Sequence, residues 1–591
     1  MPPTYRAPIE DVAFLLRDLL DYDGEIATLP GFEDADLETV LEVLGAGGQF
    51  CSEVLAPLNG PADREGCHFE DGRVRTPEGF REAYAAFVEG GWAGLGADPA
   101  QGGAGLPHVA STAFGEFLAG ANLSFSTYPE LTHGAALLLA RHGSDEQRAR
   151  WLPALSSGAM SGTMCLTEAH AGTDLGLVRT RAEPDGAGGY RVSGTKIFIT
   201  AGEHDLTDDI LHLVLARLPD APAGTRGISL FAVPKRLPDG SANGVVCGSI
   251  EHKLGIRASA TCVLHYEGAR AELVGAPHRG MPIMFTMMNG ARLGVGVEGL
   301  GVGDAARQVA VAYARERLQG RSLAGPARPD LEADPIVVHP DVRLNLLRMR
   351  VLTEAGRALA LWVARELDVA ERHPDAARRQ EASDVVALMT PVVKAALTDH
   401  GVLCANLALQ VHGGHGYIVE TGVEQLVRDA RITQVYEGTN GVQALDLVGR
   451  KLPDGAGRML RRLCHPAAAW VEENRRHPEL GELAEPLGAA LGRLQRTTLW
   501  LGGRGLADRE EAGAAASEYL RLLALTTFGY LWARMAEVAL DPSTGTSAEL
   551  RRSKVELARF YMARVLPETS ALARQITAGK ATVMRLEAEL L

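Results

Sequence analysis

A change of residue pattern in the middle of the chain constrains the fold more than any other feature. From about residue 161 to 276, segments such as GYRVSGTKIFIT, DILHLVLARL and GISLFAVPK are rich in Val, Ile, Thr and aromatic residues and are separated by Gly, Pro and Asp. This pattern is typical of strands joined by turns, and no helical pattern interrupts it, which predicts an antiparallel sheet or small barrel. On both sides apolar residues recur every three to four positions, as in DVAFLLRDLLDY, and this predicts helices.

The length of the chain predicts several domains. Its 591 residues exceed what one hydrophobic core normally organises. We expect an α+β protein that is mostly α, with four parts. These are an N-terminal α-helical domain over 1–160, a central antiparallel β-barrel-like domain over 161–276, a C-terminal four-helix bundle over 277–452, and a helical extension over 453–591.

Composition excludes some classes of protein. The net charge of -15 argues against general nucleic-acid binding, which depends on positive charge. The seven Cys are scattered and form no C-x-x-C motif, which predicts reduced thiols and a cytoplasmic location. The first residues contain acids and no basic leader, so we expect no signal peptide. No uninterrupted apolar run approaches the ~20 residues that a membrane span needs, so we expect no stable span.

Two polar clusters lie at the start of the strand-rich region. MCLTEAHAGTD, residues 164–174, combines backbone amides with Thr167 and Thr173, and such a loop can bind a flat heterocycle or a phosphate. A structural turn is the alternative. In KIFIT, residues 196–200, Phe198 and Thr200 would point to the same face of a strand. Core packing is the alternative there.

Two further clusters lie in the second helical region. QVHGGHGYIVE, residues 410–420, has two His, but no nearby Cys or carboxylate completes a metal site, so we predict no metal and a close backbone approach at its glycines. In ITQVYEGTNGVQ, residues 432–443, Glu437 stands between two helical patterns, and Thr439 or Asn440 would cap the second helix. Glu437 is either a solvated loop acid or a base in a nearly dry pocket.

Two helical segments carry patterns that suggest a function. GVGVEGLGVG, residues 294–303, has the spacing of a dinucleotide fingerprint but lacks the strand and βαβ unit that this function needs. We interpret it as a helix whose small residues let a neighbour approach closely. Met281, Met284, Met287 and Met288 are expected in the core, with a pliable wall of a ligand pocket as the alternative.

Together and in this order, the four polar clusters resemble the acyl-CoA dehydrogenase family over roughly residues 50–452. LTEAHAGTD resembles its flavin loop, GTKIFIT its second flavin strand, HKLGIRAS its K-x-G-x-R-x-S segment, and VRDARITQVYEGTN the signature in which the catalytic Glu often stands. The chain departs from the family at Ala169 (usually Pro), Phe198 (often Trp) and ERLQGR, which lacks the aromatic residue of R-x-Q-F-G. The C-terminal extension resembles the long subgroup that includes 3-methylmercaptopropionyl-CoA dehydrogenases.

The resemblance implies a reaction and its partners. FAD would oxidise an acyl-CoA thioester to the trans-2-enoyl-CoA in fatty acid metabolism. Glu437 would take the pro-R α-proton, flavin N5 would accept the β-hydride, and burial beside Val435 and Tyr436 would raise the pKa of Glu437. Electron-transfer flavoprotein would be the acceptor, and the protein would be a homodimer. The alternatives are an acyl-CoA oxidase using oxygen and a non-catalytic DNA-binding relative.

The resemblance also implies the remaining site residues. The FAD-binding residues would be Met164, Leu166, Thr167, Thr173, Phe198, Thr200, Arg317, Gln319, Gln410, Gly413, Gly414, Thr439 and Asn440. The substrate-binding residues would be Thr173, Asn289, Arg292 and Gly438. Arg317 and Gln319 would reach FAD across a subunit interface, and a structural ion pair is the alternative for Arg292.

Overall fold

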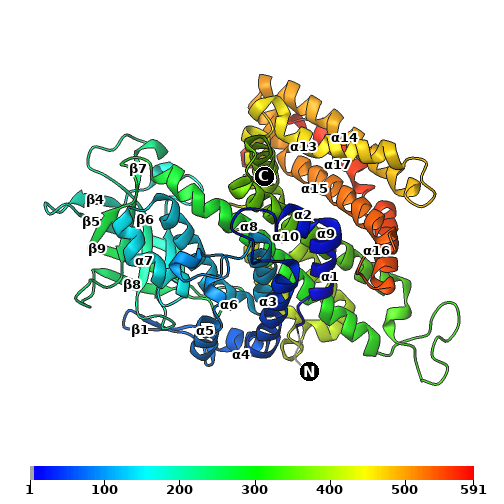
Figure 1. The fold of residues 1–591 in the computed structure, drawn as a ribbon, viewed down its shortest axis with the longest axis horizontal. Helices are drawn as coiled ribbons and strands as arrows, with labels where there is room; N and C mark the ends of the chain where they lie inside the picture. Colours follow the sequence, from blue (N-terminus) through cyan, green and yellow to red (C-terminus); the bar gives the residue numbers. More distant parts are fainter. Residues whose placement is uncertain (1–4) are drawn as a thin grey trace.

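The computed structural model describes residues 5–591 and shows a sheet at one end of the molecule, with helices from both halves of the chain at the other (Figure 1). The order is helices, sheet, helices and further helices, which confirms the predicted α+β, mostly α class.

The N-terminal region is helical except for one hairpin. Its elements are α1 (Ile9–Phe14), α2 (Tyr22–Glu25), α3 (Leu37–Phe50), α4 (Ala56–Glu65), β1 (His68–Glu70), β2 (Arg73–Arg75), α5 (Phe80–Glu89), α6 (His108–His142) and α7 (Asp145–Ser157). Ser144 caps α7 as part of a capping box with Gln147. The β1–β2 hairpin was not predicted, although its turn, Asp71-Gly72, has positive φ at both residues, and Asp-Gly is a strong signal for such a turn.

The central region is a seven-stranded sheet. Its strands are β3 (Ser161–Cys165), β4 (Arg181–Pro184), β5 (Tyr190–Thr200), β6 (Ile210–Arg217), β7 (Ile228–Pro234), β8 (Val245–Ile250) and β9 (Thr261–Leu273). The order is β3-β6-β4-β5-β9-β7, β8 pairs with β9, and β7 also pairs with β6. The β6–β7 pairing closes the path, as in the predicted barrel-like domain.

The prediction of an antiparallel sheet is wrong at β6, which pairs in parallel with β4 at one position, Arg181 opposite Arg217, and with β3 along its length. The strand β3 runs parallel to β6 from Ser161 opposite Ile210 to Cys165 opposite Val214. A tight hairpin cannot join parallel neighbours, and here β4 and β5 lie between the two strands in the sequence.

The bundle contains three long helices and shorter partners. They are α8 (Gly280–Glu316), α9 (Pro340–Arg372), α10 (Ala376–His412), α11 (Val423–Thr433) and α12 (Asn440–Asp446). A Cβ added at Gly296 would lie 2.6 Å from Val393, and one at Gly299 would lie 2.7 Å from Thr398. Sequence position therefore increases in the same direction along both helices, so α8 and α10 run parallel and in close contact. This confirms the interpretation of residues 294–303 as a helix of small residues.

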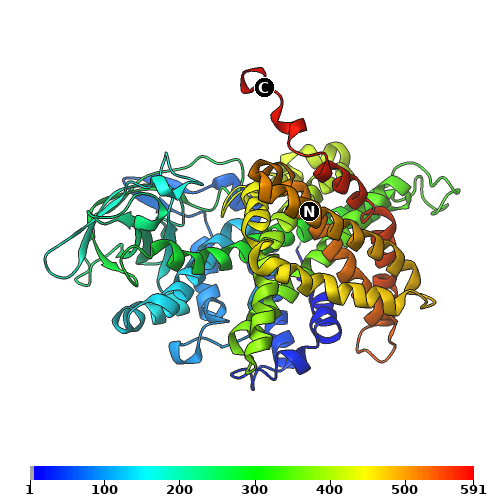
Figure 2. The same ribbon diagram turned by 90° about the horizontal axis from the view of Figure 1, so that it is seen from above.

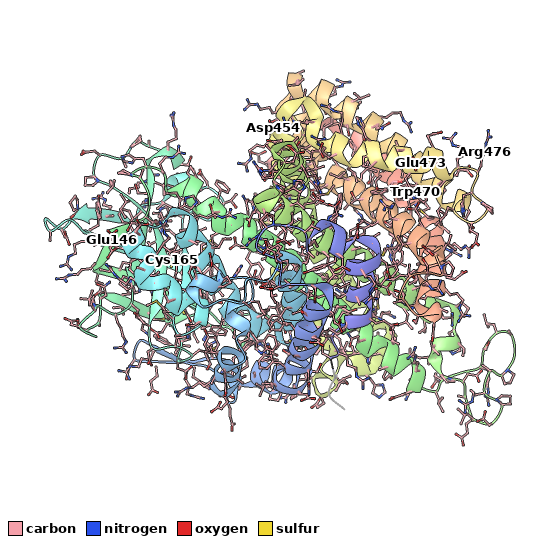
Figure 3. All side chains as sticks on the ribbon, viewed as in Figure 1. Glu146, Cys165, Asp454, Trp470, Glu473 and Arg476 are labelled. Carbon is pink, nitrogen blue, oxygen red and sulfur yellow. The ribbon has the colours of Figure 1, made fainter. Side chains whose placement is uncertain are left out.

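The extension continues the helical part of the molecule with α13 (Arg458–Asn474), α14 (Gly481–Ala507), α15 (Arg509–Leu540), α16 (Ala548–Arg564), α17 (Glu568–Thr577) and α18 (Ala581–Met584). Figure 3 places Trp470 in this region, well away from Cys165 on β3. The Trp470 Nε1–H donates to Glu537 on α15 over 2.9 Å. The last residues extend away from the body of the molecule (Figure 2).

One hydrophobic core joins the N-terminal helices, the bundle and the extension, while the sheet end has two smaller cores. Within the described residues, the segment Ala376–Tyr417, which contains α10, is long and apolar enough to cross a membrane by length and composition. This segment packs against α8 and α9 inside the bundle. A buried core helix can meet the same criterion of length and composition as a membrane span. Met284 and Met287 are buried, in agreement with the predicted core role of the methionines.

Candidate active site

Glu437 lies in a tight turn between α11 and α12. Its φ is +56°, a left-handed conformation that is unfavourable for a residue with a side chain, and Gly438 follows with φ +83°. The Thr439 hydroxyl accepts the N–H of Val442 at 3.3 Å, which confirms Thr439 as the cap of α12. The amide of Gln443 donates to the carbonyls of Glu437 and Gly438 at 3.0 and 3.3 Å, so the turn is held from within α12.

The carboxylate of Glu437 points into the protein. The residue as a whole is half-buried, but its Oε2 atom is buried and has no hydrogen-bond partner among the described residues. Burial raises the pKa of Glu437 to about 7, with a further increase from the negative charge of Glu298, whereas the charges of Arg292 and Lys394 oppose the rise. A solvated loop acid would have neither property.

The surroundings of Glu437 differ from the predicted apolar ones. Val435 is 45% exposed, so it does not bury the carboxylate. The hydroxyl of Tyr436 donates to Glu298, so this side chain brings a polar contact to the site. The predicted direction of the pKa shift is therefore right, but it was attributed to the wrong neighbours.

Arg292 makes the structural ion pair that was the alternative to substrate binding. This α8 side chain is 5% exposed, and its Nη1 lies 3.4 Å from Asp446 Oδ2 on α12. Its Nε is buried without a partner among the described residues. Asn289, one turn earlier on α8, is exposed.

Lys394 joins α10 to the turn after Glu437. It is fully buried, its Nζ donates to Asn440 Oδ1 at 2.8 Å, and burial lowers its pKa to about 8. The side-chain amide of Asn440 also bonds to Thr398 and Asp399. Because residues of α10 already hydrogen-bond the side-chain amide of Asn440, any contact of Asn440 with a cofactor would use its main chain.

A second group of predicted residues meets at the sheet. Glu168, in the loop after β3, accepts a hydrogen bond from buried Lys196 on β5 at 2.9 Å, and the pKa of Glu168 falls to about 2 because Lys196 and nearby N–H groups outweigh its burial. The N–H of Ile197 donates to the Thr167 carbonyl at 2.9 Å. These contacts tie the predicted flavin loop to the predicted flavin strand.

The residues of this group differ in exposure. Phe198 sits at an irregularity of β5 with φ +59° and is 58% exposed, so the core-packing alternative is wrong for it. Thr173 is exposed, Leu166 and Thr200 are half-buried, and Met164 is 7% exposed within a core.

A third group lies at the other end of the bundle. Arg317, Gln319, Gln410, Gly413 and Gly414 are all exposed, and they follow or end the parallel helices α8 and α10. The Tyr313 ring stacks on His412 with centroids 4.2 Å apart and its hydroxyl lies 3.3 Å from His415, which fixes the two helix ends together. At ~1.5 Å per residue, this end lies roughly 27 Å along α8 from Glu298. Within one chain the third group is therefore remote from Glu437.

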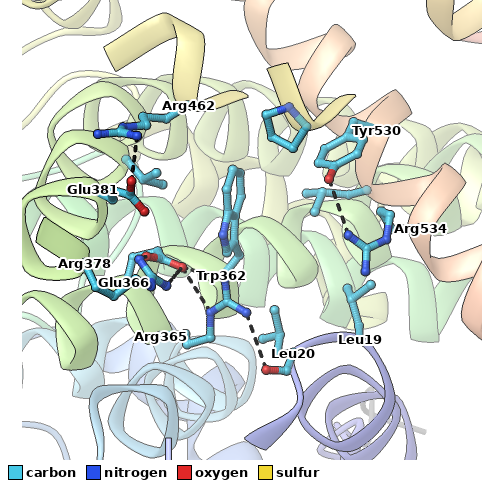
Figure 4. A pocket seen from close by; sticks show the side chains of 13 residues that line it. Leu19, Leu20, Trp362, Arg365, Glu366, Arg378, Glu381, Arg462, Tyr530 and Arg534 are labelled. Carbon is cyan, nitrogen blue, oxygen red and sulfur yellow. Dashed lines mark hydrogen bonds and ion pairs between the residues drawn. The ribbon is translucent and has the colours of Figure 1, made fainter. Parts of the chain in front are cut away.

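A cavity of about 270 Å³ lies elsewhere, in the seam between the first helices, the bundle and the extension (Figure 4). The residues lining it include Arg365, Arg378 and Arg462, which pair with Glu366 and Glu381. None of the predicted site residues lines this cavity.

The sequence interpretation missed three residues around Glu437: Glu130 on α6, Glu298 on α8 and Lys394 on α10. Glu298 had a signal, because it is the one charged residue in the apolar run GVGVEGLGVG. Glu130 and Lys394 had none, since their contacts with the site depend on how distant helices pack.

Comparison with known proteins assigns the family. Family models match in chain order as the acyl-CoA dehydrogenase N-terminal domain (residues 42–159), middle domain (163–269) and C-terminal domain (278–452), followed by an acetyl-CoA dehydrogenase C-terminal-like domain (463–587). The chain is 43% identical to 3-methylmercaptopropionyl-CoA dehydrogenase of Ruegeria pomeroyi, covering 97% of this chain and 98% of that protein. It is 31% identical to the broad-specificity linear acyl-CoA dehydrogenase FadE5 of Mycobacterium tuberculosis, covering 99% of each.

Solved structures share the fold. ACDH-11 of Caenorhabditis elegans, in complex with C11-CoA, superposes with a TM-score of 0.80 at 21% identity, covering 100% of this chain and 97% of that one. An acyl-CoA dehydrogenase of Bacillus anthracis complexed with FAD gives a TM-score of 0.74 at 20% identity, covering 94% and 90%. The four colinear domains and the full-length relatives together show that this chain belongs to the acyl-CoA dehydrogenase family and is an oxidoreductase of its long, C-terminally extended form.

Proposed function

We propose that the protein catalyses the FAD-dependent α,β-dehydrogenation of an acyl-CoA thioester, with Glu437 as the base. The observation that carries this proposal is the buried, unpartnered Oε2 of Glu437, on a carboxylate whose pKa is raised to about 7. A carboxylate with a pKa near the working pH is a stronger base than an ordinary one, and about half of it is still ionised.

The residues present fit a large flat cofactor. Phe198 is exposed beside a loop in which a Cβ added at Gly172 would meet nothing within 4 Å, and the same holds for Gly413 and Gly414 at the end of α10. Exposed glycines without close neighbours allow a ligand to reach the backbone. Leu166, Thr167 and Thr200 would hold the flavin ring, and Thr173 its phosphates or the coenzyme A. Bound FAD would supply the acceptor for the β-hydride.

The turn at Glu437 also supplies a donor for the thioester. No acceptor among the described residues takes the main-chain N–H of Glu437, although the turn around it is hydrogen-bonded. A free N–H in a turn that is itself fixed by hydrogen bonds can stabilise the negative charge that develops on the thioester oxygen as the α-proton leaves. The base and the oxyanion donor then belong to one residue, so their relative geometry is fixed by the turn.

The relatives suggest a substrate class and an electron acceptor. We propose 3-methylmercaptopropionyl-CoA and linear acyl-CoA thioesters as substrates, because the full-length relatives are named for them. Electron-transfer flavoprotein is the proposed acceptor, oxygen being the alternative, and a homodimer would place Arg317, Gln319, Gln410 and the two glycines near FAD bound by the other subunit. The net charge of -15 speaks against a DNA-binding role.

Flavin colour tests the proposal. The purified protein should be yellow and should bleach under anaerobic conditions when mixed with one member of a panel containing 3-methylmercaptopropionyl-CoA and linear acyl-CoA thioesters of increasing length. Reoxidation by electron-transfer flavoprotein and by air, measured separately, distinguishes dehydrogenase from oxidase. A colourless protein, or a yellow one that no thioester bleaches, would contradict the proposal.

A further inference from the structure

Two further carboxylates lie near Glu437, Glu298 buried and Glu130 half-buried, and they approach each other across a helix–helix contact. Glu298 on α8 is 4% exposed. Glu130 on α6 lies against Gly294, where an added Cβ would be 2.1 Å from its Oε1 atom. Gly294 and Glu298 are four residues apart, so they share one face of α8 on successive turns. The glycine therefore leaves the space that lets Glu130 reach Glu298.

These carboxylates lack the cations that normally accompany buried acids. Among the described residues, neither Glu130 nor Glu298 takes part in an ion pair within 4.0 Å. Burial together with the charge of Glu298 raises the pKa of Glu130 well above its usual range, and burial raises the pKa of Glu298 as well. Two acids that share one site in this way hold one proton between them.

Glu298 accepts a second hydrogen bond, from the hydroxyl of Tyr436. Tyr436 directly precedes Glu437, whose left-handed φ of +56° has to be maintained by its surroundings. Gln443 holds the carbonyl side of this turn, as described above, and Glu298 holds the other side through Tyr436. The conformation that aims the Glu437 carboxylate is thus fixed from two helices.

Charged groups face Glu437 from each element packed around it. From α8 come Arg292, which is paired with Asp446, and Glu298. From α10 comes Lys394, bonded to Asn440, and Asp399 lies one turn further on that helix. The remaining groups are Glu130 on α6 and Arg450, which pairs with Asp446. Arg292 and Lys394 stabilise the ionised form of Glu437, whereas Glu298 is the nearby group that opposes it.

We propose that Glu298 is a positioning residue for the base: held by the hydroxyl of Tyr436, with Glu130 on the facing helix, it fixes the turn that aims Glu437 and keeps a negative charge beside it. This inference rests on the proposed function. In the reaction the α-proton moves from the substrate carbon to the Glu437 carboxylate, which becomes neutral, while the β-hydride leaves to the flavin. The transfer relieves the repulsion between Glu437 and Glu298, so that charge favours proton abstraction.

Two variants separate the two effects. Glu298→Gln keeps an oxygen acceptor for Tyr436 and removes the charge, whereas Tyr436→Phe keeps the charge and removes the hydrogen bond. The readout is the rate of anaerobic flavin bleaching by a saturating acyl-CoA as a function of pH. Flavin content and thermal unfolding are measured on the same preparations, and Glu473→Gln, on the exposed surface of α13, is the matched control.

The two variants should change different parts of the pH profile. For Glu298→Gln we expect the acid limb of the profile to move to lower pH by about one unit, because a neighbouring negative charge is lost. For Tyr436→Phe we expect the limb to stay near its wild-type position and the plateau rate to fall about tenfold, because the base is less well aimed. The control should match the wild type in both respects.

The outcomes that overturn the inference differ from those that overturn the function. A Glu298→Gln protein with full flavin content and an unmoved acid limb contradicts the charge role, and a Tyr436→Phe protein with a wild-type plateau contradicts the positioning role. If Glu298→Gln does not fold, the Tyr436→Phe plateau still decides the positioning role. In each case Glu437→Gln should bleach far more slowly than the wild type, and bleaching by that variant at the wild-type rate would instead overturn the assignment of the base.

Discussion

Two of the places where the molecule buries ionisable side chains differ in whether the charges there are balanced. The first place is the junction of α1, α6, α8, α9 and α16, where Arg357 contacts Glu116 at 2.6 Å and Asp304 at 3.4 Å. The cations there are Arg307, Arg350, Arg357 and Lys554, and the anions are Asp11, Glu116, Asp304 and Glu354. The second place is the site around Glu437, where carboxylates outnumber their close cationic partners.

The two places differ in what burial does to their acids. At the junction, Lys554 and Arg357 hold the pKa of Asp11 at about 2, and Arg307 and Arg357 keep that of Asp304 below its usual value. Glu116 moves the other way, because burial raises its pKa to about 7 despite its contact with Arg357. At the site, burial raises the pKa of Glu130, Glu298 and Glu437 together. The junction thus resembles a structural network, whereas the site keeps acids in a destabilised state, as reactive groups require.

The largest effect is expected at the junction. Arg357→Met should lower the free energy of unfolding by about 3–5 kcal/mol, because it leaves Glu116, Asp11 and Asp304 buried with fewer cations. Chemical denaturation measures this change, with Arg476→Met on the surface as the control. A loss below about 1 kcal/mol would mean that the network does not stabilise the fold and would remove one side of the comparison.

An intermediate effect is expected beneath the predicted flavin loop. Lys196→Met leaves buried Glu168 without its cation and should cost about 3 kcal/mol, with part of the bound flavin lost. The pKa of Glu168 is depressed in the folded protein, so its contribution to stability is present above its ordinary pKa of 4.5 and is lost as the pH falls toward about 2. The free energy of unfolding, measured against pH, should show this dependence in the wild type and in the control variant Lys451→Met. In Lys196→Met the dependence should be weak.

The smallest effect on stability is expected at the site itself. Glu298→Gln should change the free energy of unfolding by less than about 1 kcal/mol or should stabilise the protein, because it removes a buried charge that lacks a cation. A loss as large as that of Arg357→Met would show that Glu298 belongs to a structural network, and the contrast between the two places would fail.

The sequence predicted local features of the fold and site better than long-range ones. The order of helices and strands, the Thr439 cap and the close α8–α10 approach follow from periodicity, capping chemistry and small residues, which are properties of neighbouring positions. The parallel β3–β6 pair was missed because pairing partners 49 residues apart leave no local mark.

The same limit explains the errors at the site. Tyr436 was interpreted as an apolar neighbour because its partner Glu298 lies 138 residues away in the sequence. For Arg292 the ion pair could be named only as an alternative, because its partner Asp446 lies 154 residues away in the sequence. Glu298 is different, because a single acid in an apolar run can be noticed in the sequence even though its partners cannot.

The most direct test of the whole account compares the wild type with Glu437→Gln in anaerobic flavin bleaching by a substrate acyl-CoA across pH 5 to 9. For the wild type the account predicts a rate that rises with pH through about 7, since Glu437 must lose its proton to act as a base. It predicts that Glu437→Gln stays yellow and bleaches about 10²- to 10⁴-fold more slowly. A Glu437→Gln protein that bleaches at the wild-type rate would contradict it.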